Sequence, residues 1–139
     1  MSLYQFEYHL KVSFEDLDPM NVVWHGNYMR YMEQARCELL DKLGYTYMDM
    51  KSDGFAYPVA KMKVKYIKPA LFRDNLTLRL DIISIEPALD IKYTMFNNSG
   101  DKIFEGQTMQ ICLNTTTMQS IYTPPRRLEL AIKRLSDEK

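Results

Sequence analysis

The sequence is poor in the residues that build metal centres and disulfide frameworks. It has two cysteines and two histidines in 139 residues. Neither Cys37 nor Cys112 has the spacing of a metal ligand, and His9 and His25 are not grouped with them. No glycine-rich phosphate loop is present either. We therefore expect two reduced structural thiols, no bound metal and no cofactor.

Other absences narrow the class of protein further. The 18 Lys and Arg residues balance the 18 Asp and Glu residues, so the chain lacks the basic excess of a dedicated nucleic-acid binder. It also lacks an N-terminal apolar segment and a long apolar run, so we expect a cytoplasmic protein without a membrane span. No repeat or linker is visible, and we expect residues 1–139 to form a single domain.

Apolar and polar residues alternate along five stretches, and this period of two predicts five strands. The first is expected over residues 4–14, with Tyr4 and Phe14 at the two ends of its apolar face. The segment Asn97–Asp101 carries a strong hairpin turn signal. The other four strands are expected at residues 60–66, 76–82, 89–95 and 102–114.

The period becomes helical between the first two predicted strands. Asn27 is a plausible N-cap and Gly44 is a natural stop. A short amphipathic helix is expected at residues 128–135. One long helix among successive strands predicts an α+β protein, with the helix against the apolar face of an antiparallel sheet. The apolar stripe of the long helix consists of Tyr28, Tyr31, Met32, Ala35, Leu39 and Leu43.

The segment from residue 14 to residue 31 reads FEDLDPMNVVWHGNYMRY. Its Asp-x-Asp, paired valines, aromatic residue, histidine and Asn-Tyr helix start resemble the 4-hydroxybenzoyl-CoA thioesterase family, including the Tol-Pal-associated acyl-CoA thioesterase branch. The match continues in Arg36 and Glu38, in Tyr-Ile-Lys-Pro-Ala at residues 66–70, and in Asp74. The resemblance covers essentially the whole chain and implies a hotdog fold, a sheet wrapped around one central helix.

The resemblance also implies a function. Such subunits form homodimers or homotetramers with active sites between subunits, and they hydrolyse acyl-CoA or acyl carrier protein thioesters. It assigns Asp18 as the catalytic carboxylate, which either attacks the thioester or deprotonates water. The thiolate leaves readily, because its pKa is about 8–9 by analogy with cysteine. Asp16, by contrast, is expected to be structural, as a turn or capping carboxylate.

The start of the predicted helix supplies the remaining candidates. Backbone N–H groups around Trp24, His25 and Gly26 would stabilise negative charge on the carbonyl oxygen. Gly26 would allow backbone and substrate to approach closely. The His25 side chain either contacts the thioester or Asp18, or has a capping or packing role. Tyr28 is either a substrate contact or a core residue.

Two departures from the family pattern bear on these expectations. Asn21 stands where many members have glycine, and asparagine also tolerates a positive φ, so the turn is expected to be kept. The segment Ile85–Leu89 lacks the basic residues with which some members contact the nucleotide. A hydratase or dehydratase of acyl thioesters is a weaker alternative. That chemistry generally needs a catalytic histidine with an acid at a different site, and one of the two histidines, His9, lies on the polar face of a predicted strand. A non-catalytic acyl-thioester binder on the same fold is the third hypothesis.

Overall fold

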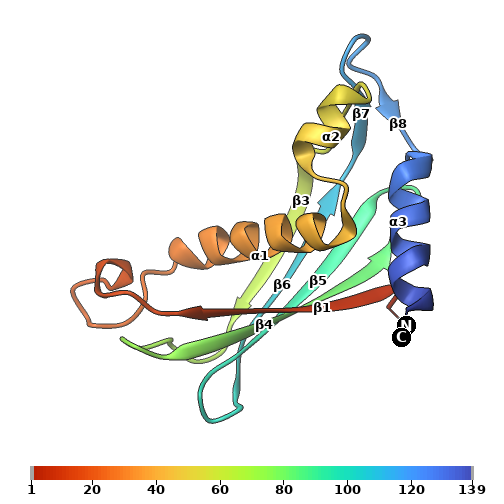
Figure 1. The fold of residues 1–139 in the computed structure, drawn as a ribbon. Helices are drawn as coiled ribbons and strands as arrows, with labels where there is room; N and C mark the ends of the chain where they lie inside the picture. The colour runs from red at the N-terminus through yellow and green to blue at the C-terminus, as the bar shows by residue number, and fades with distance from the viewer. Residues whose placement is uncertain (1, 139) are drawn as a thin grey trace.

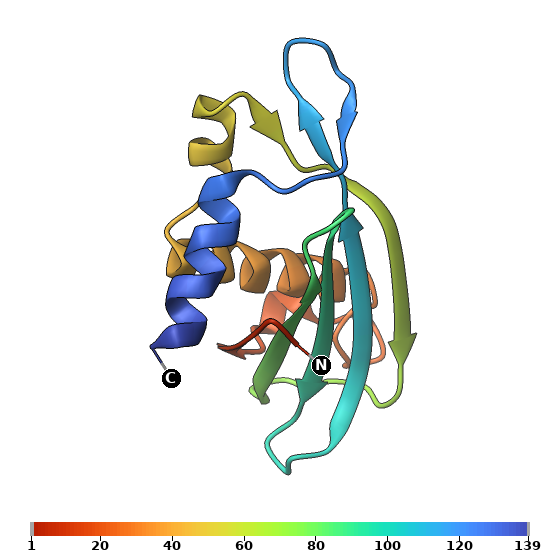
Figure 2. The same cartoon turned by 90° about the vertical axis from the view of Figure 1, so that its right-hand side faces the viewer.

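The computed structural model describes residues 2–138 and is built around one antiparallel sheet. Its five strands lie in the order β1-β4-β5-β6-β3, and the sheet curves around helix α1 (Asn27–Leu43) (Figures 1 and 2). The fold is therefore α+β with the hotdog arrangement, as predicted. The strands are β1 (Tyr4–Lys11), β3 (Val59–Tyr66), β4 (Asn75–Ser84), β5 (Leu89–Phe96) and β6 (Lys102–Gln110).

The centre of the sheet confirms the predicted apolar face, whereas Asp81 and Thr94 on the opposite face are buried and not solvent-facing. Four apolar side chains of β4 are fully buried, and the four of β5 are almost fully buried. The Asn97–Asp101 turn joins β5 to β6, with Gly100 at a φ of 82° and the Asn97 N–H donating to the Asp101 carbonyl. These buried residues are Leu76, Leu78, Leu80 and Ile82 in β4, and Leu89, Ile91, Tyr93 and Met95 in β5.

Helix α1 buries the apolar stripe that the sequence predicted. All six residues of the stripe are at most 3% exposed. Leu40 and Arg36 are buried as well, and Arg36 donates hydrogen bonds to the hydroxyls of Tyr47 and Tyr93. The helix begins at Asn27, and its N-cap is Gly26. The expected capping role of Asn27 is therefore wrong, and its side chain instead donates to a loop carbonyl.

The remaining elements lie beside this core. A three-stranded sheet is formed by short strands in the order β2-β7-β8, and the C-terminal helix packs near β1 and α1 (Figure 1). The predicted strand at 102–114 is two strands, because Ile111 leaves the ladder and donates its N–H to the Pro58 carbonyl. These elements are η1 (Phe14–Asp16), α2 (Tyr47–Ser52), β2 (Phe55–Ala56), β7 (Cys112–Asn114), β8 (Ser120–Ile121) and α3 (Arg126–Asp137).

The two outer parts of the predicted sheet differ from expectation. The first strand ends at Lys11 and not at residue 14, and Phe14 is 73% exposed in η1. Strand β3 lies at an edge of the sheet, so its apolar residues Met62 and Tyr66 stay 47% and 45% exposed. Across residues 2–138, no helix is both long and apolar enough to cross a membrane. In the same range, no cluster of three or more His, Cys, Asp or Glu side chains could hold a metal ion.

Candidate active site

A small hairpin carries the predicted catalytic carboxylate to the start of α1. Leu17 pairs with Val23 in an antiparallel bridge, and the Asp18 N–H donates to the Val22 carbonyl at 2.8 Å. The turn closes with Asn21 at a φ of 63°, and the Asn21 N–H donates to the Asp18 carbonyl. Asn21 thus adopts the left-handed conformation, as expected.

The Asp18 side chain is held by its own turn. Its Oδ1 accepts the Met20 N–H at 2.8 Å, as is typical of an aspartate before proline in a turn. The residue is half-buried. Within residues 2–138, no hydrogen-bond donor contacts the second carboxylate oxygen, Oδ2. One oxygen therefore fixes the orientation of the carboxylate, and the other remains available to a ligand.

The first turn of α1 leaves two backbone donors unused. The N–H groups of Asn27, Tyr28 and Met29 donate to carbonyls three residues earlier. The N–H groups of His25 and Gly26 have no acceptor within residues 2–138. No side chain caps this end of the helix. Because a helix N-terminus also carries partial positive charge, these two donors suit a developing oxyanion.

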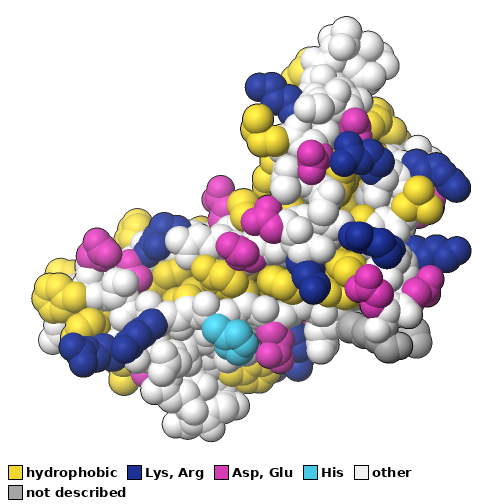
Figure 3. Space-filling view, in the orientation of Figure 1, with side chains coloured by type: hydrophobic (Ala, Val, Ile, Leu, Met, Phe, Trp, Pro, Cys, Tyr) yellow, Lys and Arg dark blue, Asp and Glu magenta, His cyan; other side chains and the backbone are white. Residues whose placement is uncertain are grey.

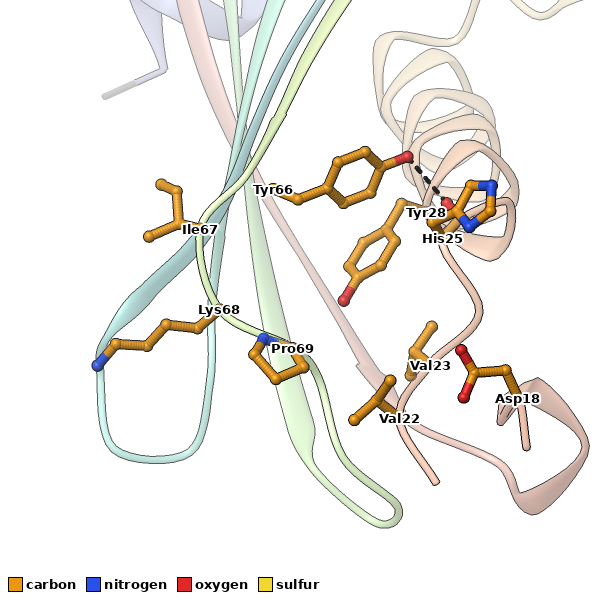
Figure 4. A pocket seen from close by; sticks show the side chains of 9 residues that line it. All are labelled: Asp18, Val22, Val23, His25, Tyr28, Tyr66, Ile67, Lys68 and Pro69. Carbon is orange, nitrogen blue, oxygen red and sulfur yellow. Dashed lines mark hydrogen bonds between the residues drawn. The ribbon is translucent and has the colours of Figure 1, made fainter. Parts of the chain in front are cut away.

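A pocket of about 300 Å³ opens between this corner and the end of β3. Figure 4 shows Asp18, the two valines and His25 on one wall, and the segment that follows β3 on the other. The lining is mainly apolar and aromatic, which suits a small organic group with a few polar anchors. The lining residues are Asp18, Val22, Val23, His25, Tyr28, Tyr66, Ile67, Lys68 and Pro69.

Two tyrosines join the walls of the pocket. The Tyr66 hydroxyl donates to the His25 carbonyl at 3.0 Å, and the Tyr28 hydroxyl accepts the Ala70 N–H at 3.1 Å. The Tyr28 ring stacks on Phe104 with centroids 4.9 Å apart. Burial raises the pKa of Tyr28 and that of Tyr66 above the usual value for tyrosine. Both hydroxyls therefore stay protonated at neutral pH.

The structure brings three of the five predicted site residues together in the pocket: Asp18, His25 and Tyr28. No hydrogen bond or ion pair joins Asp18 to the His25 ring in the described part of the chain. The His25 ring instead lies near the rings of Trp24 and Tyr66, with centroids 5.2 and 6.4 Å away. This arrangement gives His25 a place in the pocket wall without a direct partnership with the carboxylate.

The other two predicted residues lie outside this pocket. The Trp24 N–H donates to the Asp16 carbonyl at 2.9 Å and is not available to a substrate. The Trp24 ring covers Gly26, where an added Cβ would lie 2.3 Å from a ring carbon. A side chain at Gly26 would therefore clash with the tryptophan ring. Gly26 lines a second groove, between β1 and α1, together with Met29 and Cys37, on the face shown in Figure 3.

The sequence did not predict the second wall of the pocket. Residues 66–70 matched the family only as a supporting motif, yet four of them line the pocket. Ala70 fixes this segment to the hairpin, because its carbonyl accepts the Val23 N–H at 2.9 Å. Lys68 also lines the pocket, and its ammonium group pairs with Asp101 at 3.3 Å. Such a contact between distant segments leaves no local signal in the sequence.

Comparisons with known proteins identify the family. Residues 12–131 match the family model described as the thioesterase-like superfamily. The chain is 27% identical over 136 residues to a 1,4-dihydroxy-2-naphthoyl-CoA hydrolase of Thermosynechococcus vestitus, covering 94% of this chain and 93% of the relative. It is 27% identical over 128 residues to the acyl-CoA thioester hydrolase YbgC of Escherichia coli O157:H7, covering 91% and 92%.

Solved structures give the same result. A DHNA-CoA thioesterase from Staphylococcus aureus superposes with a TM-score of 0.81 at 26% identity, covering 96% of this chain and 94% of that one. These matches support the wider superfamily and do not single out its 4-hydroxybenzoyl-CoA branch. With a family match over most of its length and the sheet wrapped around one helix, the chain belongs to the thioesterase-like superfamily of hotdog-fold thioester hydrolases.

Proposed function

We propose that the protein hydrolyses acyl-CoA thioesters, with Asp18 as the catalytic carboxylate. One observation supports the proposal: the oriented carboxylate of Asp18 lines the same pocket as His25, whose N–H is unused, and the unused N–H of Gly26 comes next in the chain. The relatives named as acyl-CoA thioester hydrolase and 1,4-dihydroxy-2-naphthoyl-CoA hydrolase support the substrate class. The acyl group would occupy the pocket between Val22, Tyr28 and the end of β3.

The chemistry needs a nucleophile and a site for the oxyanion. In one route the available oxygen of Asp18 would attack the thioester carbon and expel the thiolate, and water would then hydrolyse the mixed anhydride. In the other it would take a proton from a water that attacks the thioester carbon. The N–H groups of His25 and Gly26 would donate hydrogen bonds to the negatively charged carbonyl oxygen, and one well-placed donor contributes about 10²–10³-fold. Coenzyme A then leaves as a thiolate, and no general acid is needed to protonate it.

The test follows thiol release from a panel of short, long and aromatic acyl-CoAs. We expect Asp18→Asn to lower kcat/KM by about 10²-fold or more while the melting temperature stays unchanged. Asp41→Asn is the control, because Asp41 is an exposed carboxylate on the last turn of α1, at the end far from Asp18. It is expected to hydrolyse acyl-CoA at the parent rate.

The other outcomes separate the alternatives. Equal activity in Asp18→Asn and the parent would leave the thioesterase activity standing and remove Asp18 from the mechanism, with His25 as the next residue to replace. Turnover of acyl carrier protein thioesters alone would change the carrier and keep the site. If neither carrier is hydrolysed, and if acyl-CoA binds the parent and Asp18→Asn equally, the protein is a binder and the proposal is wrong.

We further propose that residues 1–139 form one domain and act in the cytoplasm as a homodimer or homotetramer. Strand β3 supports the assembly, because it is a sheet edge with apolar side chains left half exposed. Val59 and Met62 on β3 are 44% and 47% exposed. The pocket lies beside the end of this strand, so a second copy paired along β3 would border the site.

The assembly is tested by sedimentation of the parent and of Met62→Glu. A charge on the apolar face of the edge strand is expected to dissociate the oligomer to smaller species and to lower thioesterase activity with it. Leu130→Glu is the control, because Leu130 is 49% exposed on α3, away from β3. A monomeric parent would contradict the assembly and leave the proposed chemistry untouched.

A further inference from the structure

Asp16 is one of the few buried charged residues of the chain, at 5% exposed. Its carboxylate pairs with Arg30, accepts the Tyr31 hydroxyl at 2.7 Å and accepts the Ser13 N–H at 3.4 Å. Arg30 and Tyr31 both belong to the first turns of α1, and Tyr31 is 1% exposed. Two side chains of the helix therefore hold this single carboxylate at a fixed distance from the helix axis.

The backbone of Asp16 carries a second set of contacts. Its carbonyl accepts the Trp24 N–H and the Asn27 side-chain amide, both at 2.9 Å. The first contact closes the open end of the hairpin that holds Asp18. The second fixes that hairpin to the first residue of α1. Arg30 strengthens the connection, because its Nε lies 3.4 Å from the Asn27 side-chain oxygen.

These contacts determine which backbone donors are left unused. With the Trp24 N–H bound to Asp16, the next two N–H groups along the chain, of His25 and Gly26, are the ones left over. The same residue fixes the other strand of the hairpin two positions before Asp18. A turn or capping role, as expected from the sequence, would need only the contact with Ser13. The additional contacts of the Asp16 carboxylate with Arg30 and Tyr31 of α1 are not needed for such a role.

We propose that Asp16 is the positioning residue of this site. It sets the distance between the Asp18 carboxylate and the His25 and Gly26 N–H groups, acting through Trp24 and Asn27 and touching no substrate itself. The inference rests on the proposed function, because the distance matters only if these groups act on one thioester. A misplacement of about 1 Å in such an arrangement lowers turnover by about 10²-fold.

The chain offers a matched pair of tyrosines for the test. Tyr31 donates its hydroxyl to Asp16, and Tyr45 donates its hydroxyl to Asp53 at 3.1 Å near the other end of α1. Both rings are 1% exposed. We expect Tyr31→Phe to lower kcat by about tenfold or more with KM changed less than about threefold. Tyr45→Phe is expected to keep the parent kcat.

A second pair changes the carboxylates themselves. Asp16→Asn is expected to lower kcat by about 10- to 100-fold. Asp81→Asn is its control, because Asp81 is also buried, at 8% exposed, and accepts a hydrogen bond from Gln5 on the outer face of the sheet. Asp81→Asn should lose a similar amount of thermal stability and keep its kcat. If Asp16→Asn fails to fold, Tyr31→Phe carries the test.

Amide hydrogen exchange gives a measure that needs no substrate. The Trp24 N–H depends directly on Asp16, so its protection should fall by about tenfold in Tyr31→Phe and stay unchanged in Tyr45→Phe. Loss of kcat together with faster Trp24 exchange, in the Asp16 and Tyr31 variants alone, is the expected result. A kcat equal to that of the controls, or unchanged Trp24 exchange, would overturn the proposal. If the parent hydrolyses no thioester, the proposed function fails, and exchange at Trp24 still decides whether Asp16 holds the hairpin.

Discussion

The two ends of helix α1 are built in opposite ways. At its C-terminal end Gly44 adopts a φ of 74°, and the Tyr45 N–H donates to the Leu40 carbonyl in a Schellman arrangement. Arg134 of α3 then donates to the Leu43 carbonyl at 3.0 Å. At the N-terminal end no side chain caps the helix, and the His25 and Gly26 N–H groups lack an acceptor within residues 2–138.

We interpret the C-terminal end of α1 as the end that stabilises the helix, and the N-terminal end as the one that serves the proposed site. Helix ends leave backbone groups that proteins normally satisfy with caps, and the C-terminal end of α1 follows this rule. The N-terminal end breaks the rule beside a pocket and an oriented carboxylate. Breaks of this kind are expected where a protein binds a ligand. The same substitution made at each end should therefore affect different properties.

The largest difference is expected for Gly26→Ala. The new Cβ would lie 2.3 Å from the Trp24 ring, so the ring must move, and we expect the loop that carries it to shift as well. Since the N–H donors of His25 and Gly26 lie on this loop, we expect kcat to fall by about tenfold or more. Thiol release from acyl-CoA measures the loss. The double variant Gly26→Ala, Trp24→Ala removes the clash and should recover most of it; failure to recover would contradict the role given to the ring.

Gly44→Ala should act on stability and not on turnover. A left-handed conformation costs a residue with a Cβ about 1–2 kcal/mol, and the φ of 74° lies in that region. Thermal or denaturant unfolding should show this loss, with kcat equal to that of the parent. A fall in kcat greater than about threefold would show that the two ends are not independent.

The smallest effect is expected for Arg134→Met. It removes one hydrogen bond to the Leu43 carbonyl, for which about 0.5–1.5 kcal/mol is typical. Denaturant unfolding is the measurement, again with thioesterase activity unchanged. An unfolding free energy equal to that of the parent would mean that water replaces the guanidinium at this end of the helix.

The sequence predicts the part of the fold that repeats a simple period. The alternation in β4 and β5 and the stripe on α1 come from local pattern, because burial on one face imposes that pattern on every turn or strand. Gly44 and the Asn97–Asp101 turn are also local, since each requires a particular backbone conformation. The prediction of Asp18 came from the resemblance, and its catalytic role stays a prediction.

The start of α1 is less predictable because distant residues determine it. Asn27 has the chemistry of a cap, but its side chain donates to the Asp16 carbonyl and the helix starts one residue earlier than predicted, at Asn27 itself. Helix α2 was not predicted, although Thr46 and Asp49 form a local capping box at its start. Its Tyr47 hydroxyl accepts hydrogen bonds from Arg36 and from Gln110 of β6. The second pocket wall depends on Ala70 in the same way. Such contacts join residues far apart in the chain and produce no period.

The central claim concerns the two unused N–H groups, and amide NMR tests it most directly. ¹⁵N-labelled protein would be titrated with an acyl-CoA analogue in which a methylene group replaces the thioester sulfur, leaving a ketone that is not hydrolysed. The His25 and Gly26 amide resonances should shift strongly as the ketone oxygen takes their hydrogen bonds, and Gly44 should not shift. Saturable binding that leaves both His25 and Gly26 unmoved would contradict the claim.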